Sequence, residues 1–214
     1  MIPIKKEALL VSPSDVKPTS NKFSVIGTFN PGVARLSNGN IVLYVRVAEK
    51  LKNEATEDNK YYYAPRCIGE KTCKLHFDQF KKEEVQSKSD SDIIFKDETK
   101  RLMFISHFRR VVLDKTGFNI KSIDKTPSFT GLSTNGELGV EDPRITKIGD
   151  KYAMTYVSLS RQGNISTSLA LSKDCLKWER LGTIFSEQNK DVVLFPEKIK
   201  DSYYIFNRPE GGIN

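Results

Sequence analysis

The sequence has little of what marks a membrane or secreted protein. Its N-terminal stretch, MIPIKKEALLVSP, is charged and holds no apolar run as long as that of a signal peptide. No segment approaches the roughly 20 apolar residues that a membrane helix needs. We therefore expect no membrane partner and a cytoplasmic location. The apolar content of 38% over 214 residues is still enough to bury a sizeable core.

Cysteine is scarce, with only three residues: Cys67, Cys73 and Cys175. An odd number without a signal peptide favours a reducing compartment, in agreement with the cytoplasm. Cys67 and Cys73 lie near His76 in the chain, but their spacing matches no zinc pattern and a fourth ligand is missing nearby. We therefore predict no metal site.

Charge of one sign is not concentrated in any segment. The 34 Lys and Arg residues exceed the 27 Asp and Glu residues by seven, but lysines and acids alternate, as in KKEEVQSKSDSD at 81–92. No recognition-helix, zinc-finger or RNA-binding motif accompanies the excess of positive charge. We expect no nucleic-acid partner, and a basic surface that favours anionic substrates.

Long amphipathic helices are also absent, and the apolar period is two almost everywhere. In NIVLYVRV, at 40–47, the residues Ile41, Leu43, Val45 and Val47 share one face of an expected strand. The chain therefore reads as all-β. Residues 49–92 break this rhythm, and we expect long polar surface loops there, with one ordered strand at YYYAPRCIG, 61–69.

A strand–turn–strand unit recurs along the chain. It is seen at 34–46, 143–158 and 196–208, with a weaker copy at 95–109. A β unit that repeats every 40–50 residues is typical of a β-propeller blade, so we expect a single propeller domain over 1–214 with about four blades. A β-sandwich is the alternative. The single tryptophan, Trp178, is interpreted as a residue that packs blades together.

The stretch GVEDPR, at 139–144, places two acids, a proline and an arginine at a strand start. Pro143 disfavours the helical region for Asp142, which predicts an extended Asp142 aimed in a fixed direction. Glu141 would then point the opposite way and pair with an arginine. A nearby like charge or burial would raise a carboxyl pKa and suit it to donate a proton. An ion-paired structural turn is the other interpretation.

Five sequence blocks, taken together and in order, resemble a known family. They are FNPGVARLSNGNIVLYVRVAE, GVEDPRITKIGDKYAMTYVS, SLALSKDCLKWERLGTIF, NKDVVLFPEKI and YYIFNRPEGG. This order is similar to that in the β-mannoside phosphorylases and related hydrolases of glycoside hydrolase family 130. The resemblance implies a five-bladed propeller with its active site in the central depression. It also implies that the chain lacks the C-terminal part of the family.

The resemblance implies an acid–phosphate mechanism. Asp142 matches the general acid, whose proton reaches the glycosidic oxygen through a sugar hydroxyl. Inorganic phosphate then attacks with inversion and gives α-mannose 1-phosphate. No cofactor is expected, because phosphate is the co-substrate. The implied phosphate-binding residues are Arg161, Lys190, Arg208 and Asn207, and Asn207 replaces a histidine that many of these phosphorylases carry.

The resemblance also implies contacts with a β-mannooligosaccharide. Asn30 and Arg46 match positions beside the sugar next to the cleaved bond, and the further expected substrate contacts are Glu141, Arg144 and Asp191. Two alternatives stay open: a β-mannoside hydrolase with Glu187, Glu197 or Glu210 as base, and a non-catalytic sugar-binding propeller fragment. A homo-oligomer also stays open.

Overall fold

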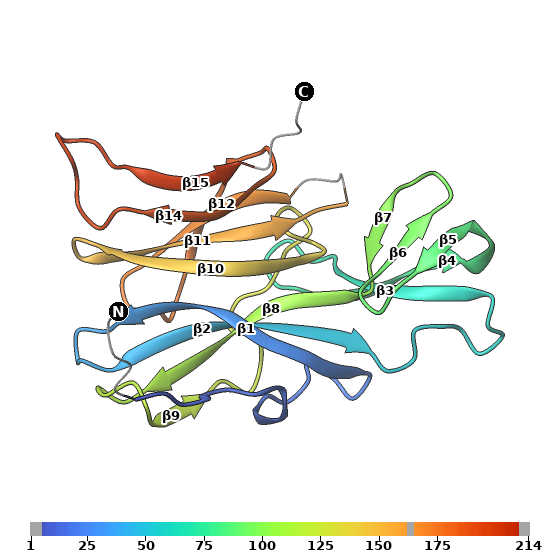
Figure 1. Ribbon diagram of the computed structural model, residues 1–214, viewed down its shortest axis with the longest axis horizontal. Coiled ribbons are helices and arrows are strands. Elements are labelled where there is room, and N and C mark those ends of the chain that lie inside the picture. The colour runs from blue at the N-terminus through green and yellow to red at the C-terminus, as the bar shows by residue number, and fades with distance from the viewer. Residues whose placement is uncertain (1–5, 162–164, 210–214) are drawn as a thin grey trace.

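The computed structural model describes residues 6–161 and 165–209, and Figure 1 shows that strands dominate it. Two four-stranded antiparallel sheets form its centre. The first sheet has the order β1-β2-β8-β9, formed by Phe23–Arg35, Ile41–Leu51, Phe104–Leu113 and Ile120–Ile123. The second has the order β10-β11-β12-β13, formed by Gly139–Ile148, Lys151–Leu159, Ile165–Ser172 and Glu179–Phe185.

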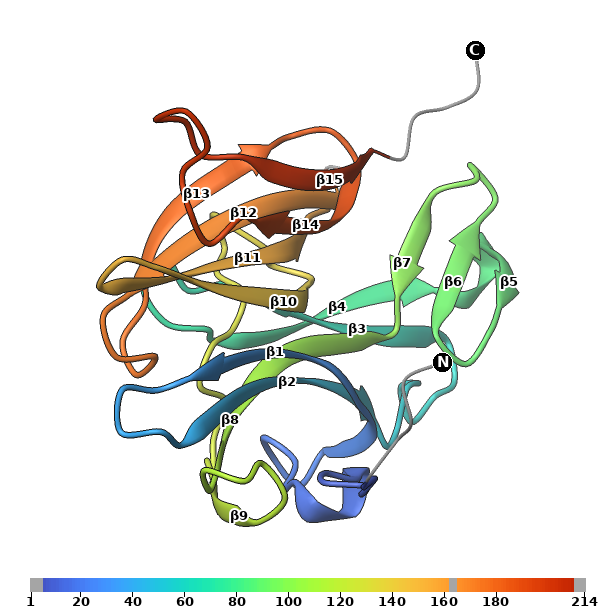
Figure 2. The ribbon, with the colours of Figure 1, turned by 60° about the vertical axis from the view of Figure 1, so that its left-hand side comes forward.

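Three smaller sheets complete the described part of the chain. A two-stranded sheet pairs β14, Asn189–Leu194, with β15, Ile205–Pro209. The inserted arm, residues 61–102, holds the other two and projects from the first sheet (Figures 1 and 2). Its elements are β3 Tyr61–Cys67, β4 Leu75–Lys81, the 3-10 turn η2 Lys82–Glu84, β5 Val85–Lys88, β6 Asp92–Phe95 and β7 Lys100–Leu102. A second 3-10 turn, η1, covers Pro13–Asp15.

The prediction of an all-β chain is confirmed, and the sheets divide differently from the expected four blades. The weak repeat at 95–109 does not start a blade, because β8 pairs with β2 and forms the third strand of the first sheet. The arm is inserted between these two partners. In the repeat at 196–208, the strand that pairs with β15 lies earlier, at β14. Among the described residues, no helix is long and apolar enough to cross a membrane.

The inserted arm is ordered where long loops were expected. The strand predicted at 61–69 is confirmed as β3, which pairs with β4. A small core of its own explains the order: Ala64, Ile93 and Met103 are buried and pack with aromatic neighbours such as Phe80 and Phe95. Polar residues separate these core residues in the sequence, so the arm shows no regular apolar period. Cys67 and Cys73 form a disulfide at the base of the arm, whereas the sequence had favoured free thiols.

The two large sheets meet through aromatic side chains. The Tyr44 hydroxyl donates to the Cys175 carbonyl at 2.8 Å, and the Tyr44 ring meets Trp178 edge-on at 5.5 Å. Phe108 and Phe129 stack beside them at 5.6 Å. Aromatic pairs of this geometry stabilise beyond their buried area. The prediction that Trp178 packs blades together is confirmed.

A buried polar network lies inside the first sheet. The Arg109 guanidinium donates to His107 Nε2 at 3.0 Å and to the Lys17 carbonyl at 2.9 Å, and it lies 3.6 Å from Glu49 Oε1. Arg109 and Glu49 are both at most 1% exposed. Burial raises the pKa of Glu49, while a hydrogen bond from Thr19 and the charge of Arg109 oppose that rise. The positive charge of Arg109 therefore offsets the unfavourable burial of the Glu49 carboxylate.

Replacing Arg109 should leave the buried Glu49 carboxylate without this cationic partner. Arg109→Met is expected to lower the free energy of unfolding by about 3–5 kcal/mol, measured by urea denaturation. Arg110→Met is the matched control, because Arg110 is partly exposed and pairs with Asp124 at 3.0 Å. The control should cost only about 0–1 kcal/mol. Equal losses in both variants would contradict the role given to the buried pair.

Candidate active site

Three neighbouring strands, β1, β10 and β14, carry the same irregularity. Each is the first strand of its sheet; β1 contacts β10, and β10 contacts β14. Pairing skips two residues in each strand, at 30–31, 142–143 and 191–192. The first skipped residue always has a positive φ: 45° at Asn30, 49° at Asp142 and 55° at Asp191. Asn and Asp tolerate this region better than other side chains do.

The bulge at Asp142 corrects two expectations about GVEDPR. Asp142 is not extended, because its φ of 49° lies in the left-handed region. Glu141 and Asp142 do not point in opposite directions, since both carboxylates reach Arg46. A bulge adds a residue to one strand and breaks the alternation of side chains, which the period-two argument could not foresee.

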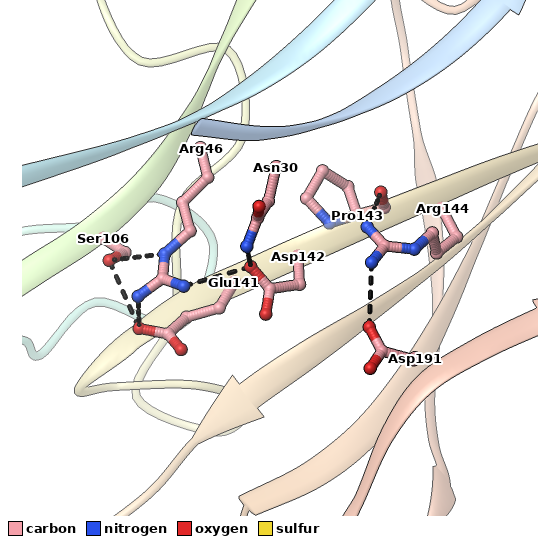
Figure 3. Close-up of polar contacts among 8 residues, drawn as sticks. All are labelled: Asn30, Arg46, Ser106, Glu141, Asp142, Pro143, Arg144 and Asp191. Atoms are coloured by element: carbon pink, nitrogen blue, oxygen red, sulfur yellow. Dashed lines mark hydrogen bonds and ion pairs between the residues drawn. The ribbon is translucent and has the colours of Figure 1, made fainter. Parts of the chain in front are cut away.

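Arg46 joins the carboxylates of β10 to the first sheet (Figure 3). Its Nη1 lies 3.0 Å from Asp142 Oδ1, its Nη2 pairs with Glu141 Oε1, and its Nε donates to Ser106 Oγ at 3.3 Å. Asn30 Nδ2 also donates to Asp142 Oδ1, at 2.8 Å. The sequence prediction therefore named four residues that meet: Asn30, Arg46, Glu141 and Asp142.

The second oxygen of Asp142 is directed away from this cluster. Within the described residues, the polar contacts found for the Asp142 carboxylate all fall on Oδ1. Figure 3 shows Oδ2 pointing away from Arg46 and Asn30. The fixed Oδ1 orients the group and leaves Oδ2 for another hydrogen-bonding partner.

Glu141 is largely buried, with a side chain that is 12% exposed against 15% for Asp142. Burial raises its pKa; the positive charge of Arg46 opposes this, the nearby charge of Asp142 adds to it, and Ser106 and Lys190 oppose it. The contribution of Lys190 indicates that β14 brings a cation close to the carboxylates of β10. On the first sheet, Asn30 contacts Asp142 and Arg46 contacts both carboxylates, so the site spans three sheets.

The cationic side of the site is organised by Asp191. Its Oδ1 accepts from Arg144 Nη2 at 2.8 Å, and its Oδ2 lies 3.1 Å from Arg208 Nη1. Lys190 stands directly opposite Arg208 in the β14–β15 pairing. The predicted residues Arg144, Lys190, Asp191 and Arg208 therefore lie together. Asn207, next to Arg208 on β15, is exposed.

Arg161 lies apart from these contacts. Its backbone N–H donates to Glu137 Oε1 at 2.9 Å. Its side chain lines a cavity of about 660 Å³ together with residues of the inserted arm, among them Arg101. Glu187 and Glu197, the alternative bases, are exposed, and Glu210 lies outside the described residues.

Two glycines allow the strands around the site to come close. Gly139 has a φ of 130°, and a Cβ there would stand 2.9 Å from the Ser106 backbone nitrogen. A Cβ on Gly32 would stand 3.0 Å from the Pro143 carbonyl oxygen. Side chains at these positions would crowd β8 and β1 against β10, the strand that carries Glu141 and Asp142.

Comparison with known proteins gives this site a context. A family model described as beta-1,4-mannooligosaccharide phosphorylase matches residues 114–213, which include Asp142 and Arg208. The Beta-1,2-mannobiose phosphorylase of Listeria innocua is 34% identical over 209 residues, which are 95% of this chain and 57% of that relative. Its solved complex with beta-1,2-mannobiose superimposes with a TM-score of 0.80 over 94% of this chain.

The chain is similar to glycoside hydrolase family 130. Its fold is the β-propeller of that family. A second relative, the 1,2-beta-oligomannan phosphorylase of a Thermoanaerobacter species, is 39% identical over 98 residues, 45% of this chain and 33% of that protein. The chain spans little more than half the length of the Listeria relative.

Sequence reasoning missed four residues that contact the predicted site residues. Ser106 hydrogen-bonds to Arg46, and the Phe29 ring lies 4.6 Å from the Arg46 guanidinium carbon. Asn189 is buried, and its Oδ1 accepts the Arg208 backbone N–H at 3.0 Å. Glu137 contacts Arg161. Phe29 and Asn189 stood inside the quoted blocks and next to predicted residues, whereas Ser106 and Glu137 carried no local signal.

The raised pKa of Glu141 predicts a pH-dependent stability. Below the ordinary value of 4.5, Glu141 is protonated in both the folded and the unfolded states. As the pH rises, the unfolded chain releases this proton first, so the contribution of Glu141 to stability falls. Glu141→Gln cannot ionise. Its melting temperature relative to the unsubstituted protein should therefore be higher at about pH 7 than at about pH 4. The same difference at both pH values would contradict the burial argument.

Proposed function

We propose that the chain cleaves a β-mannoside with inorganic phosphate, with inversion, to give α-mannose 1-phosphate and a shortened sugar. The observation that carries the proposal is that an acid and two cations lie at adjacent bulges. An oriented carboxylate, Asp142, stands on β10, and the cations Lys190 and Arg208 stand on β14 and β15 beside it. The named phosphorylases among the relatives support the same reaction.

Asp142 serves as the general acid in this proposal. Asn30 and Arg46 fix its Oδ1, so Oδ2 can present a proton to a sugar hydroxyl that relays it to the glycosidic oxygen. An inverting hydrolase needs a second carboxylate to activate water. Phosphate is already a nucleophile and needs no base, so cations that hold it take the place of that second carboxylate. Asn30 and Arg46, with Glu141, also contact the sugar in this proposal.

Arg208, Lys190 and Arg161 hold the phosphate in this proposal. For this, the exposed side chain of Arg161 must turn from the cavity that it lines with Arg101 toward Arg208. Asn207 donates a hydrogen bond without adding charge. The planar guanidinium fork of arginine matches phosphate oxygens in two places. Asp191 keeps Arg144 and Arg208 oriented, because each of its oxygens pairs with one of them. Arg144 and Asp191 border the sugar as the further substrate contacts.

The substrate that we favour is a β-1,2-linked mannoside. The curated relatives are named for beta-1,2-linked substrates, while the description of the family model names beta-1,4-linked ones. Both linkages therefore belong in one assay. A hydrolase of the same fold and a non-catalytic sugar-binding propeller are the competing outcomes.

We propose a cytoplasmic location and a homo-oligomeric state for the chain. Cytosolic thiols are usually kept reduced, so the Cys67–Cys73 disulfide counts against the cytoplasm. Differential alkylation of protein from its native cells reports whether the two thiols are free. Light scattering on the purified chain reports its oligomeric state.

Phosphate dependence is the direct test of the reaction. The chain is incubated with β-1,2- and β-1,4-mannobiose, with and without inorganic phosphate, and the products are separated by chromatography. We expect mannose 1-phosphate, formed only when phosphate is present. Free mannose released without phosphate would replace the proposal with hydrolysis, and binding without turnover would leave a sugar-binding protein.

Asp142→Asn is the control for that assay. Asn keeps the shape and tolerates the positive φ at this position, so the fold should persist. Turnover should fall by about 10²–10⁴-fold, because a general acid contributes rate on that scale. Full activity in this variant would remove Asp142 from the acid role.

The phosphate-binding assignment predicts a selective change in KM. Arg208→Met should raise the KM for phosphate about 10- to 100-fold, since a hydrogen bond to a charged group is lost. The KM for the mannoside should change little. Asn207→Ala is the neighbouring comparison and should change the phosphate KM less. A larger effect in Asn207→Ala, or a change confined to the mannoside KM, would contradict the assignment.

A further inference from the structure

Arg161 carries an exposed side chain on a backbone that is held by a buried acid. Its side chain is 56% exposed, whereas that of Glu137 is only 11% exposed. Glu137 Oε1 accepts the Arg161 backbone N–H at 2.9 Å and lies 3.7 Å from Arg161 Nε. One carboxylate oxygen therefore faces both the main chain and the guanidinium of Arg161, at the end of β11.

The loop that carries Glu137 is itself fixed from two sides. On one side, the Cys67 N–H donates to the Glu137 carbonyl at 2.8 Å, and the Ser133 N–H donates to the Gly69 carbonyl at 3.0 Å. Gly69 belongs to the loop that the Cys67–Cys73 disulfide closes. On the other side, the Asn135 amide joins Tyr156 and Ser168 at 2.9 and 2.8 Å.

Arg161 lies near other positive charges, and the Glu137 carboxylate balances them. Burial lowers the pKa of Arg101, Asp78 opposes this, and the positive charges of Arg66 and Arg161 add to the lowering. Arg101 and Arg161 line the same cavity. Without the Glu137 carboxylate beside it, the Arg161 guanidinium would be repelled by the positive charges of Arg101 and Arg66.

We propose that Glu137 is a positioning residue for Arg161, and that the disulfide-closed loop at 67–73 keeps Glu137 in place. The inference rests on the proposed function in one respect, namely that Arg161 binds the phosphate. Glu137 itself does not touch phosphate or sugar. It fixes the main chain at Arg161 and balances the positive charge of the guanidinium, so that the side chain extends from one fixed point.

The test compares Glu137→Ala with Glu137→Gln in the full chain. Alanine removes the acceptor of the Arg161 N–H, so the KM for phosphate should rise about 10-fold while kcat stays within about 2-fold. Glutamine keeps an acceptor oxygen, so its KM should rise less. In parallel, amide hydrogen exchange at Arg161 should be faster by about 10-fold in Glu137→Ala and close to normal in Glu137→Gln.

Two further variants complete the design. Glu70→Gln, an exposed acid in the disulfide-closed loop, is the matched control and should change neither quantity. Cys73→Ser opens that loop and should raise the phosphate KM and speed Arg161 exchange in part. Unchanged values in Cys73→Ser would overturn the role of the disulfide.

The outcomes separate this inference from the proposed function. If the unsubstituted chain shows no phosphate-dependent turnover, the proposed function fails. Amide exchange at Arg161 then tests by itself whether Glu137 positions Arg161. Unchanged exchange and an unchanged phosphate KM in Glu137→Ala would overturn the inference. A joint collapse of kcat, both KM values and the melting temperature would also overturn it, because that pattern indicates a structural role only.

Discussion

The contact of Arg46 with Glu141 and Asp142 is the interaction on which the rest of the site depends. Arg46 belongs to the first sheet and the two carboxylates to the second, so one guanidinium joins the sheets and orients the acids. Burying Glu141 is unfavourable, and Arg46 offsets much of that cost. The contact forms only because the bulge on β10 turns both acids to the same side and Gly139 lets β8 approach.

The sequence predicted those features that depend on period and order. Alternating apolar residues indicated strands, and the order of five blocks indicated the family, whose pattern singled out Asp142 and Arg46. The bulges could not be predicted from alternation, because a bulge is the place where alternation fails. Ser106 could not be predicted either, since it lies in an ordinary strand and acquires its role only when β8 pairs with β2. The arm was mistaken for loops because its core is small and interrupted.

The repeated bulge explains how one fold places opposite charges side by side. Each first strand directs one short polar side chain inward: Asn30 as a neutral donor, Asp142 as an acid and Asp191 as a partner for cations. In the proposed reaction, Asn30 orients the general acid, Asp142 is that acid, and Asp191 orients a cation that binds phosphate. A propeller can vary the chemistry of its site by changing the residue at one bulge per blade.

The most direct measurement is a crystal structure of the chain with β-mannobiose and sulfate, a phosphate analogue that cannot support the reaction. The account predicts the sugar beside Asp142, with one hydroxyl within about 3 Å of Oδ2, and the anion against Arg208 and Lys190. Asn30 and Arg46 would keep their contacts with Oδ1. A sugar bound away from Asp142, or an anion bound without Arg208 and Lys190, would contradict it.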